Sequence, residues 1–218
     1  IHSDIIGRLL ASSLNIPRLI SCVRNDYSKI TWLWHIDKYT SHKPNLYIAN
    51  SKALKPYLNK LNIPKQKRRY IPNGVDIKNL EENAQNIRPT LGFNKKDKII
   101  ICVARLVKQK NHKTLIQALT HLPQEYKLLI VGDGSEKQTL QEQTKKYGVE
   151  NRVTFLGRRE DVPSLLQSSD IFCLPSLTEG MSNALLEAMA LGIPCVVSNI
   201  KQNKILIQNE VNGLTHKT

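Results

Sequence analysis

The sequence contains no long hydrophobic run, no Cys-x-x-Cys pair and few aromatic side chains. Because no run reaches about 18 apolar residues, no helix is expected to span a membrane. The cysteines are too far apart for the paired spacing of zinc or redox sites. Three of them lie in apolar runs, which predicts small buried side chains in a reducing compartment: Cys102, Cys173 and Cys195.

Acidic residues are also scarce, with 18 Asp and Glu against 32 Lys and Arg, a net charge of +14. Residues 1–100 hold 18 basic and 7 acidic groups (+11), whereas residues 101–218 hold 14 and 11 (+3). Such a field favours phosphates, anionic lipid headgroups or nucleic acid, and a solvated Lys-rich surface is the alternative. The densest cluster, 65–69, has no aromatic RNA-binding motif, zinc-finger spacing or basic zipper beside it, so we expect no nucleic-acid partner.

What is present is a core-forming composition, 40% apolar, in which short β-rich runs alternate with helical periodicity. This pattern predicts an α/β fold of parallel sheets covered on both faces. The predicted strands are 18–23, 46–49, 69–71, 98–104, 127–131, 153–156, 171–174 and 195–198. The predicted helices are 4–14, 51–61, 112–119, 136–147, 162–167 and 183–191.

The polar stretch 73–97 breaks this alternation and begins with the turn-like Pro72-Asn73-Gly74. We interpret it as a linker or crossing between two α/β domains. Residues 1–72 are then the end of a first domain, and residues 98–218 a second, doubly wound domain. Since two such domains need about 300 residues, we expect the chain to be truncated at both ends and the last helix to be missing.

Charged and glycine-containing loops follow the predicted strands of the second domain. Arg105 and Lys110 follow one strand, and Arg158 follows another. Because ligands bind outside the carboxyl ends of parallel strands, these loops are expected to line one site. Ser182 is a predicted N-cap, so the helix behind it offers free amides and a positive dipole end to an anion.

Two carboxylates accompany this anion-binding helix end. Glu179 lies in the preceding loop, and Glu187 lies one to two turns into the helix. Carboxylates suit hydrogen bonds from hydroxyl groups, as on a ribose or a hexose. Arg105 and Lys110 are suited to neutralising a diphosphate. The constellation therefore points to a ligand that carries both a diphosphate and hydroxyl groups.

Several stretches together resemble the GT-B glycosyltransferases of family four, the group 1 transferases. In order, the stretches are IICVARLVKQKNHKTLIQAL, LLIVGDGSEKQTLQ, RVTFLGRREDVPSLLQSSDIFCLPS and LTEGMSNALLEAMALGIPCVVS, the last with two Glu separated by seven residues. Upstream, SDIIGRLLASSLNIPRLISCVRND, IANSKALKPYL and YIPNGVDIKNL resemble the end of the family's first domain. The resemblance implies a GT-B fold of two Rossmann-like parallel-sheet domains, of which the N-terminal acceptor domain is incomplete here.

The resemblance also implies a hexosyltransferase-type activity. A sugar would move, with retention, from a UDP- or GDP-linked donor to a glycolipid or polysaccharide precursor, such as that of a bacterial lipopolysaccharide. By matching positions, Arg105, Lys110 and Glu179 would be catalytic, the first two by stabilising charge on the leaving group. The implied donor-binding residues are Arg158, Gly180, Met181, Ser182 and Glu187. No metal or other cofactor is expected.

Other interpretations remain open from the sequence. A nucleotide-sugar epimerase of GT-B type would keep the fold, and a basic, non-catalytic nucleic-acid-binding protein would use the charge alone. Several relatives place a His after a first-domain strand, where this chain has Arg24 instead. Arg24 is suited to a phosphate or acceptor contact but not to acting as a base.

A cytoplasmic location is expected, with peripheral contact to an anionic membrane as a hypothesis. Trp32 and Trp34, with Lys29, Lys38 and Lys43 nearby, would provide that contact. The favoured alternative is that the two Trp side chains pack a first-domain helix.

Overall fold

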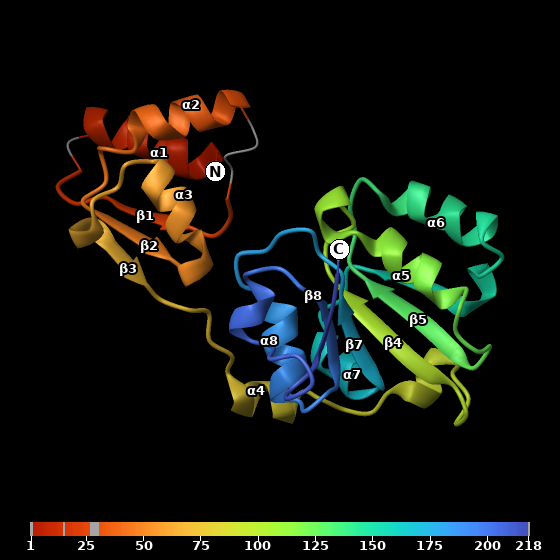
Figure 1. Ribbon diagram of the computed structural model, residues 1–218. Coiled ribbons are helices and arrows are strands. Elements are labelled where there is room, and N and C mark those ends of the chain that lie inside the picture. Colours follow the sequence, from red (N-terminus) through yellow and green to blue (C-terminus); the bar gives the residue numbers. More distant parts are fainter. Residues whose placement is uncertain (1, 15, 27–30, 218) are drawn as a thin grey trace. The chain divides into compact units, whose positions relative to one another are not determined.

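The computed structural model describes residues 2–14, 16–26 and 31–217, which form two compact units (Figure 1). The first unit comprises Ile1–Asn73 with Glu179–Met181. The second comprises Gly74–Thr178 with Ser182–Thr218. Each unit is built on its own parallel sheet.

The first unit holds a three-stranded parallel sheet in the order β1-β2-β3. Its strands are β1 (Ile20–Val23), β2 (Leu46–Ala49) and β3 (Arg68–Tyr70), and its helices are α1 (His2–Ser13), α2 (Thr31–Thr40) and α3 (Lys55–Lys60). The central strand supplies Tyr47 and Ala49 to a core that α3 completes with Tyr57 and Leu58. Trp34 packs its ring 6.0 Å from that of Tyr57.

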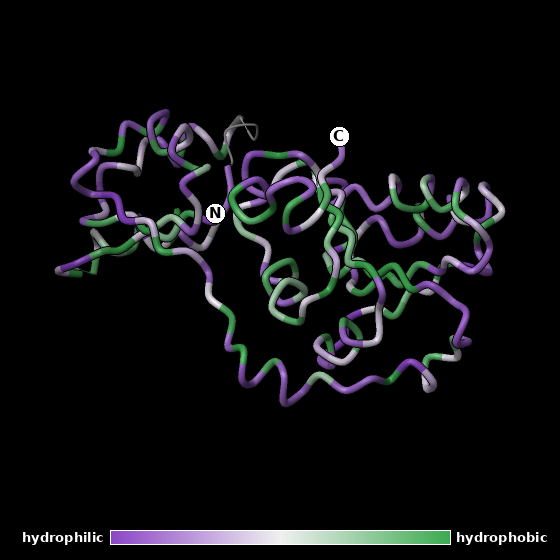
Figure 2. The backbone as a smooth tube through the Cα atoms, turned by 60° about the horizontal axis from the view of Figure 1, so that its bottom comes forward, coloured by the Kyte–Doolittle hydropathy of each residue, from purple (hydrophilic) through white to green (hydrophobic). Residues whose placement is uncertain are grey.

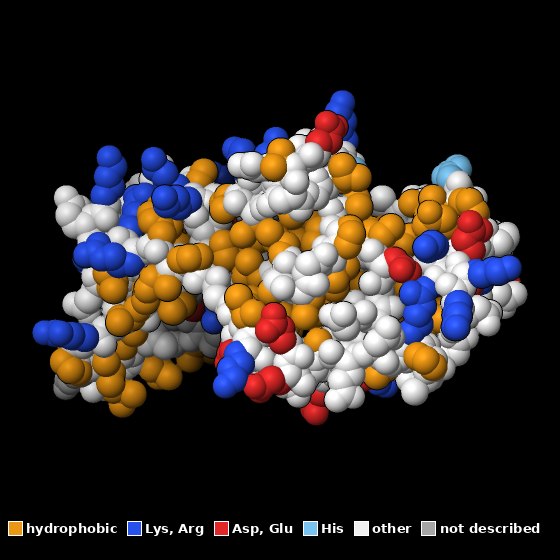
Figure 3. Space-filling view, turned by 90° about the horizontal axis from the view of Figure 1, so that it is seen from below, with side chains coloured by type: hydrophobic (Ala, Val, Ile, Leu, Met, Phe, Trp, Pro, Cys, Tyr) orange, Lys and Arg blue, Asp and Glu red, His pale blue; other side chains and the backbone are white. Residues whose placement is uncertain are grey.

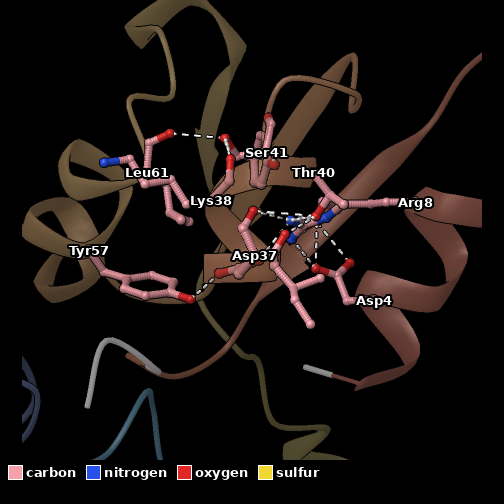
Figure 4. A network of polar contacts seen from close by, with 11 residues as sticks. Asp4, Arg8, Asp37, Lys38, Thr40, Ser41, Tyr57 and Leu61 are labelled. Atoms are coloured by element: carbon pink, nitrogen blue, oxygen red, sulfur yellow. Dashed lines mark hydrogen bonds and ion pairs between the residues drawn. The ribbon is translucent and has the colours of Figure 1, made fainter. Parts of the chain in front are cut away.

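A buried polar network joins the helices of this unit (Figure 4). The Arg8 side chain, 1% exposed, donates to an Asp37 carboxylate oxygen at 2.7 Å and also pairs with Asp4. Ser21, on β1, lies 3.0 Å from the same guanidinium, and the Tyr57 hydroxyl donates to the other Asp37 oxygen. Because a buried charge is costly unless it is paired, this network fixes α1, α2 and α3 around β1.

The second unit holds a six-stranded parallel sheet in the order β6-β5-β4-β7-β8-β9. Its strands are β4 (Lys98–Val103), β5 (Tyr126–Val131), β6 (Val153–Gly157), β7 (Ile171–Leu174), β8 (Cys195–Ser198) and β9 (Leu214–His216). Its helices are α4 (Ile77–Glu82), α5 (His112–Leu119), α6 (Lys137–Lys146), α7 (Val162–Gln167) and α8 (Asn183–Ala190).

Helices cover both faces of this sheet, α5 and α6 on one side and α7 and α8 on the other (Figure 1). The two faces have separate cores, one around Phe172 and Leu185 and the other around Ile116 and Leu140. The hydrophobic central strands run between these layers (Figure 2). After the exposed Lys98, β4 is therefore apolar to its end, because both of its faces are covered by helices.

The predicted burial of the three cysteines is confirmed, since Cys102, Cys173 and Cys195 are all buried in the second unit. Burial raises the thiol pKa of Cys173 to about 12 and that of Cys195 to about 11. These thiols are therefore unreactive at neutral pH.

The two tryptophans of α2 differ in how they pack. Trp34 packs in the first unit, as the favoured alternative expected, whereas Trp32 is 61% exposed. Lys29, named with them in the membrane hypothesis, lies outside the described residues.

Three of the described helices and strands lie outside the predicted ranges: helix α2, helix α4 and strand β9. Helix α4 lies in the stretch interpreted as a linker, and the short strand β9 extends the large sheet beside β8. The stretch after α4 is attached to the second unit, because Ser164 and Ser168 hydroxyls accept hydrogen bonds from backbone amides at residues 85 and 87.

Candidate functional site

The loop between β4 and α5 carries Arg105 and Lys110 at the carboxyl edge of the large sheet. Arg105 is exposed and Lys110 is half-buried. Between them Leu106 is fully buried, and its amide donates to the Asp133 carbonyl oxygen at 2.9 Å. The buried leucine anchors the loop and leaves the arginine in solvent.

Two glycines of the β5–α6 loop make this anchoring possible. Gly132 has φ +134°, and a Cβ there would lie 2.1 Å from the Ala104 carbonyl oxygen. A Cβ on Gly134 would lie 2.4 Å from the Leu106 carbonyl oxygen. Only glycine allows the two loops to approach so closely.

The β7–α8 loop lies against the same β4–α5 loop. The Leu177 amide donates to the Gln109 carbonyl oxygen at 2.9 Å, and the Gln109 side chain donates to the Thr178 carbonyl oxygen at 2.7 Å. These bonds confirm the prediction that the loops following two different strands share one edge of the sheet.

Helix α8 begins directly after this loop. The Ser182 hydroxyl accepts a hydrogen bond from the Leu185 amide at 3.3 Å, which confirms the predicted N-cap. Glu179, Gly180 and Met181, immediately before it, cluster with the first unit, and Glu179 is buried. The α8 N-terminus thus keeps the positive dipole end that suits an anion.

Glu187 lines a groove of about 710 Å³ within the second unit. Its carboxylate is half-buried, and burial raises its pKa above the ordinary range for a glutamate. Asn183, one helical turn earlier, lines the same groove, together with Asp161 and residues of α4. The groove therefore offers several hydrogen-bond acceptors but no cation among its lining residues.

Arg158, after β6, is exposed and none of the described hydrogen bonds joins it to the other predicted site residues. Its neighbour Arg159 forms a two-pronged ion pair with Asp161, at 2.8 and 2.6 Å. The pair lies within the β6–α7 loop and holds Asp161, which lines the groove that contains Glu187.

Sequence reasoning missed three parts of this groove: Asn183, Asp161 and the segment of α4. For Asn183 a signal existed, since residues at i and i+4 share a helix face, as Asn183 and Glu187 do. For α4 the signal was the N-cap Asp76, whose carboxylate accepts from the Asn79 amide at 3.1 Å.

The first unit has a smaller pocket of its own, with a volume of about 360 Å³. Arg24 lines it with Asp4, Arg8, Asp37 and Tyr57 of the buried network. Burial, reinforced by the hydrogen bond to Asp37, raises the pKa of the Tyr57 hydroxyl, so it remains a donor at neutral pH. The pocket thus combines a buried carboxylate, Asp37, and a partly exposed one, Asp4, with the exposed guanidinium of Arg24.

Neither a metal cluster nor a spanning helix is found within the part of the chain that the structure describes. No group of three or more His, Cys, Asp or Glu there could hold a metal ion. No helix there is long and apolar enough to cross a membrane.

Comparison with known sequences links the second unit to a defined family. A sequence model described as "Glycosyl transferases group 1" matches residues 83–218. A relative from Escherichia coli, named UDP-Gal:alpha-D-GlcNAc-diphosphoundecaprenol alpha-1,3-galactosyltransferase, is 29% identical over 97% of this chain. A relative from Campylobacter jejuni, named as an N-acetylgalactosaminyltransferase acting on a diphospho-undecaprenol substrate, is 31% identical over 73% of this chain and 42% of its own length.

Comparison with solved structures supports the fold. Alr3699/HepE of Anabaena in complex with UDP-glucose is similar over 98% of this chain, with a TM-score of 0.88 and 26% identity. The chain spans 62% of that structure and 59% of the Escherichia coli relative. The predicted GT-B fold of two Rossmann-like parallel-sheet units, the first of them small, is confirmed. Because the family's sequence model matches more than half of the chain, the chain belongs to the group 1 glycosyltransferases.

Proposed function

We propose that this chain binds a UDP-linked hexose in its second unit and transfers the hexose, with retention, to a lipid-linked saccharide. The observation that carries the proposal is the placement of Glu187 in a groove one turn behind the capped N-terminus of α8. UDP is favoured over GDP because the Anabaena structures contain UDP or UDP-glucose.

The diphosphate of the donor would lie at the N-terminus of α8. Arg105 and Lys110, on the adjoining loop, would neutralise it and stabilise the negative charge that grows on the UDP leaving group. The backbone amides of Gly180, Met181 and Ser182 would donate to the donor phosphate and sugar. With two cations and a helix dipole supplied by the chain, no metal ion is required in this proposal.

The nucleoside would occupy the groove beside α8. The Glu187 carboxylate would accept hydrogen bonds from the two ribose hydroxyls, for which it must be ionised. Arg158 would border the base at the open end of the β6–α7 loop. Glu179 would hold hydroxyls of the transferred sugar.

The acceptor would contact the first unit at the pocket lined by Arg24 and the buried network. The partly exposed Asp4 carboxylate is suited to a sugar hydroxyl, and the exposed Arg24 is suited to a phosphate. The relatives from Escherichia coli and Campylobacter jejuni are named for undecaprenol-diphosphate-linked substrates. We therefore propose an acceptor of that class, presented at the inner face of the cytoplasmic membrane.

Peripheral membrane contact would use the basic surface of the first unit. Residues 38–75 contain nine Lys and Arg and no Asp or Glu. Lys52, Lys55, Lys65 and Arg68 line one groove there, of about 380 Å³. On the face shown in Figure 3, Lys and Arg predominate over the first unit, at the left, whereas both signs of charge occur on the second.

The proposal is tested by calorimetric titration of UDP, GDP and ADP into the chain and into Glu187→Ala, each with and without EDTA. UDP is expected to bind most tightly, with EDTA having no effect, and to stabilise the chain by about 2.7 kcal/mol at 100 times its Kd. Because Glu187→Ala removes charge-assisted hydrogen bonds, its UDP affinity should fall by about tenfold or more.

The matched control is Glu142→Ala, which removes an exposed carboxylate from α6 and should leave UDP affinity unchanged. If none of the three nucleotides bound, or if Glu187→Ala bound UDP as tightly as the original chain, the proposed donor site would be wrong.

A further inference from the structure

A second pocket lies in the second unit, on the sheet face covered by α5 and α6. Its volume is about 370 Å³, and its wall includes His112, Gln143 and Leu140. Leu140 belongs to the core on the α5 side of the sheet, whereas α8, which carries Glu187, packs on the opposite face. The pocket is therefore separate from the groove assigned to the nucleoside.

The pocket contains buried polar atoms that lack hydrogen-bond partners. His112 is 2% exposed, and neither of its ring nitrogens has a partner among the described residues. The buried Gln143 Oε1 atom likewise has none in the described part of the chain. Because a buried polar group left without a hydrogen bond destabilises the fold, the His112 ring and the Gln143 oxygen together point to a polar molecule that completes the pocket.

His112 would meet such a molecule as a neutral imidazole. Burial, and then the charge of Lys110, lowers its pKa to about 4. One ring nitrogen is therefore a donor and the other an acceptor at neutral pH. Together with Gln143 Oε1, the chain offers one donor and two acceptors inside the pocket, which is the pattern that matches hydroxyl groups.

The rim of the pocket is positively charged. Lys108 and Lys113 line it, both exposed, and no ion pair is described for either. Asn111, the α5 N-cap at φ 53°, makes no side-chain cap, because its side-chain amide donates to the Pro175 carbonyl oxygen instead. The α5 N-terminus thus adds its positive dipole end to the two lysines. One carboxylate, Glu136, also lines the pocket and offers a further acceptor for hydroxyls.

We propose that this pocket binds a small sugar phosphate. Its phosphate would lie between Lys108, Lys113 and the α5 N-terminus, and its hydroxyls would bond His112 and Gln143. Its C–H face would pack on Leu140. The volume falls at the small end of the roughly 300–1,000 Å³ typical of ligand pockets, as suits a single sugar ring. This site does not depend on the proposed function, because none of the residues that line it is one of those assigned to the nucleotide-sugar donor.

The test is calorimetric titration of glucose 6-phosphate, inorganic phosphate and glucose into the chain in the absence of nucleotide. Glucose 6-phosphate is expected to bind about tenfold more tightly than either of the others, because only it satisfies both the rim and the interior. Lys108→Ala/Lys113→Ala should weaken its binding by about tenfold or more. The matched control is Lys145→Ala/Lys146→Ala, which removes two exposed lysines from the C-terminal end of α6. Neither lines the pocket, so the affinity for glucose 6-phosphate should stay unchanged.

Two further variants test the interior of the pocket. His112→Phe keeps a ring of similar volume but removes both ring nitrogens. Gln143→Met removes the buried side-chain oxygen. Because Gln143 is only partly buried, this second substitution should disturb the fold less than the one at His112. Each is expected to weaken glucose 6-phosphate binding and to leave the weak binding of inorganic phosphate unchanged.

Three results would overturn the proposal: no binding of any probe, equal affinity for glucose 6-phosphate and inorganic phosphate, or unchanged affinity in the Lys108/Lys113 variant. The second of these would show an unspecific anion site only.

Discussion

At the scale of single residues, His112 makes the stability of the second unit sensitive to acid. Its pKa is about 4 in the folded chain, against 6.5 for an unburied histidine. Between these values the unfolded chain holds the extra proton, so the free energy of unfolding falls as pH decreases from about 6.5 to about 4. At 1.36 kcal/mol per pH unit the loss approaches roughly 3 kcal/mol.

We expect His112→Gln to remove most of this acid sensitivity. Urea unfolding of both chains at about pH 7.5 and about pH 4.5 measures it, because the difference between the chains cancels the contribution of all other groups. His121→Gln, at an exposed histidine, should behave like the original chain. If all three chains lost the same free energy of unfolding between the two pH values, the acid sensitivity would not come from the buried His112.

Individual residues also show where the sequence was informative. The N-cap role of Ser182 was predictable because a cap depends on a local pattern of a few residues. The burial of Arg8 was not, since its partner Asp37 comes from a different helix and meets it only after folding. The orphaned nitrogens of His112 were equally invisible, because they depend on how α5 and α6 pack.

At the scale of elements, the close approach of the β4–α5 and β5–α6 loops depends on Gly132. Gly132→Ala would place a Cβ 2.1 Å from the Ala104 carbonyl oxygen, at φ +134°. Since backbone must move to relieve that overlap, we expect a loss of about 3 kcal/mol or more in the free energy of unfolding. The displaced loop carries Arg105, so UDP affinity should fall as well.

Gly148→Ala is the matched control for the Gly132 variant. Gly148 also has a positive φ, +64°, but a Cβ there would contact nothing within 4 Å. Its cost should stay near 1 kcal/mol, the strain of the left-handed conformation alone. Equal urea midpoints for the two variants would show that the loop contact does not matter.

The eight predicted strands all exist, with ends within two residues of the prediction. In the second unit the signal is strong because strands such as β5 and β7 are apolar runs that are largely buried. Two of the elements that were not predicted, α4 and β9, contain too few buried apolar residues to give this signal. Helix α4 buries only Leu80, and β9 has three residues and pairs only with β8. Their formation depends on contacts with the rest of the second unit, which the local pattern does not contain.

At the scale of the whole molecule, the uneven charge predicts which surface would contact a membrane under the proposed function. Flotation with vesicles of neutral lipid, and of neutral lipid with added anionic lipid, measures this. We expect binding only to the anionic vesicles, weakening with added salt, because each basic residue near such a surface contributes about 1 kcal/mol. Lys52→Gln/Lys55→Gln/Lys65→Gln should reduce it strongly.

A triple control, Lys145→Gln/Lys146→Gln/Lys201→Gln, removes the same charge from exposed positions of the second unit. If this control lost membrane binding as fully as the first variant, net charge rather than the basic grooves of the first unit would be responsible. Equal binding to neutral vesicles would reject the membrane proposal altogether.

The central claim is that the loops at the carboxyl edge of the large sheet hold a nucleotide. Hydrogen–deuterium exchange of the chain with and without UDP tests it most directly, because it reports where the ligand binds. The account predicts slower exchange within residues 104–111 and 175–187, and loss of that protection in Glu187→Ala. Protection by UDP that left both segments unchanged, or that appeared only along α6, would contradict it.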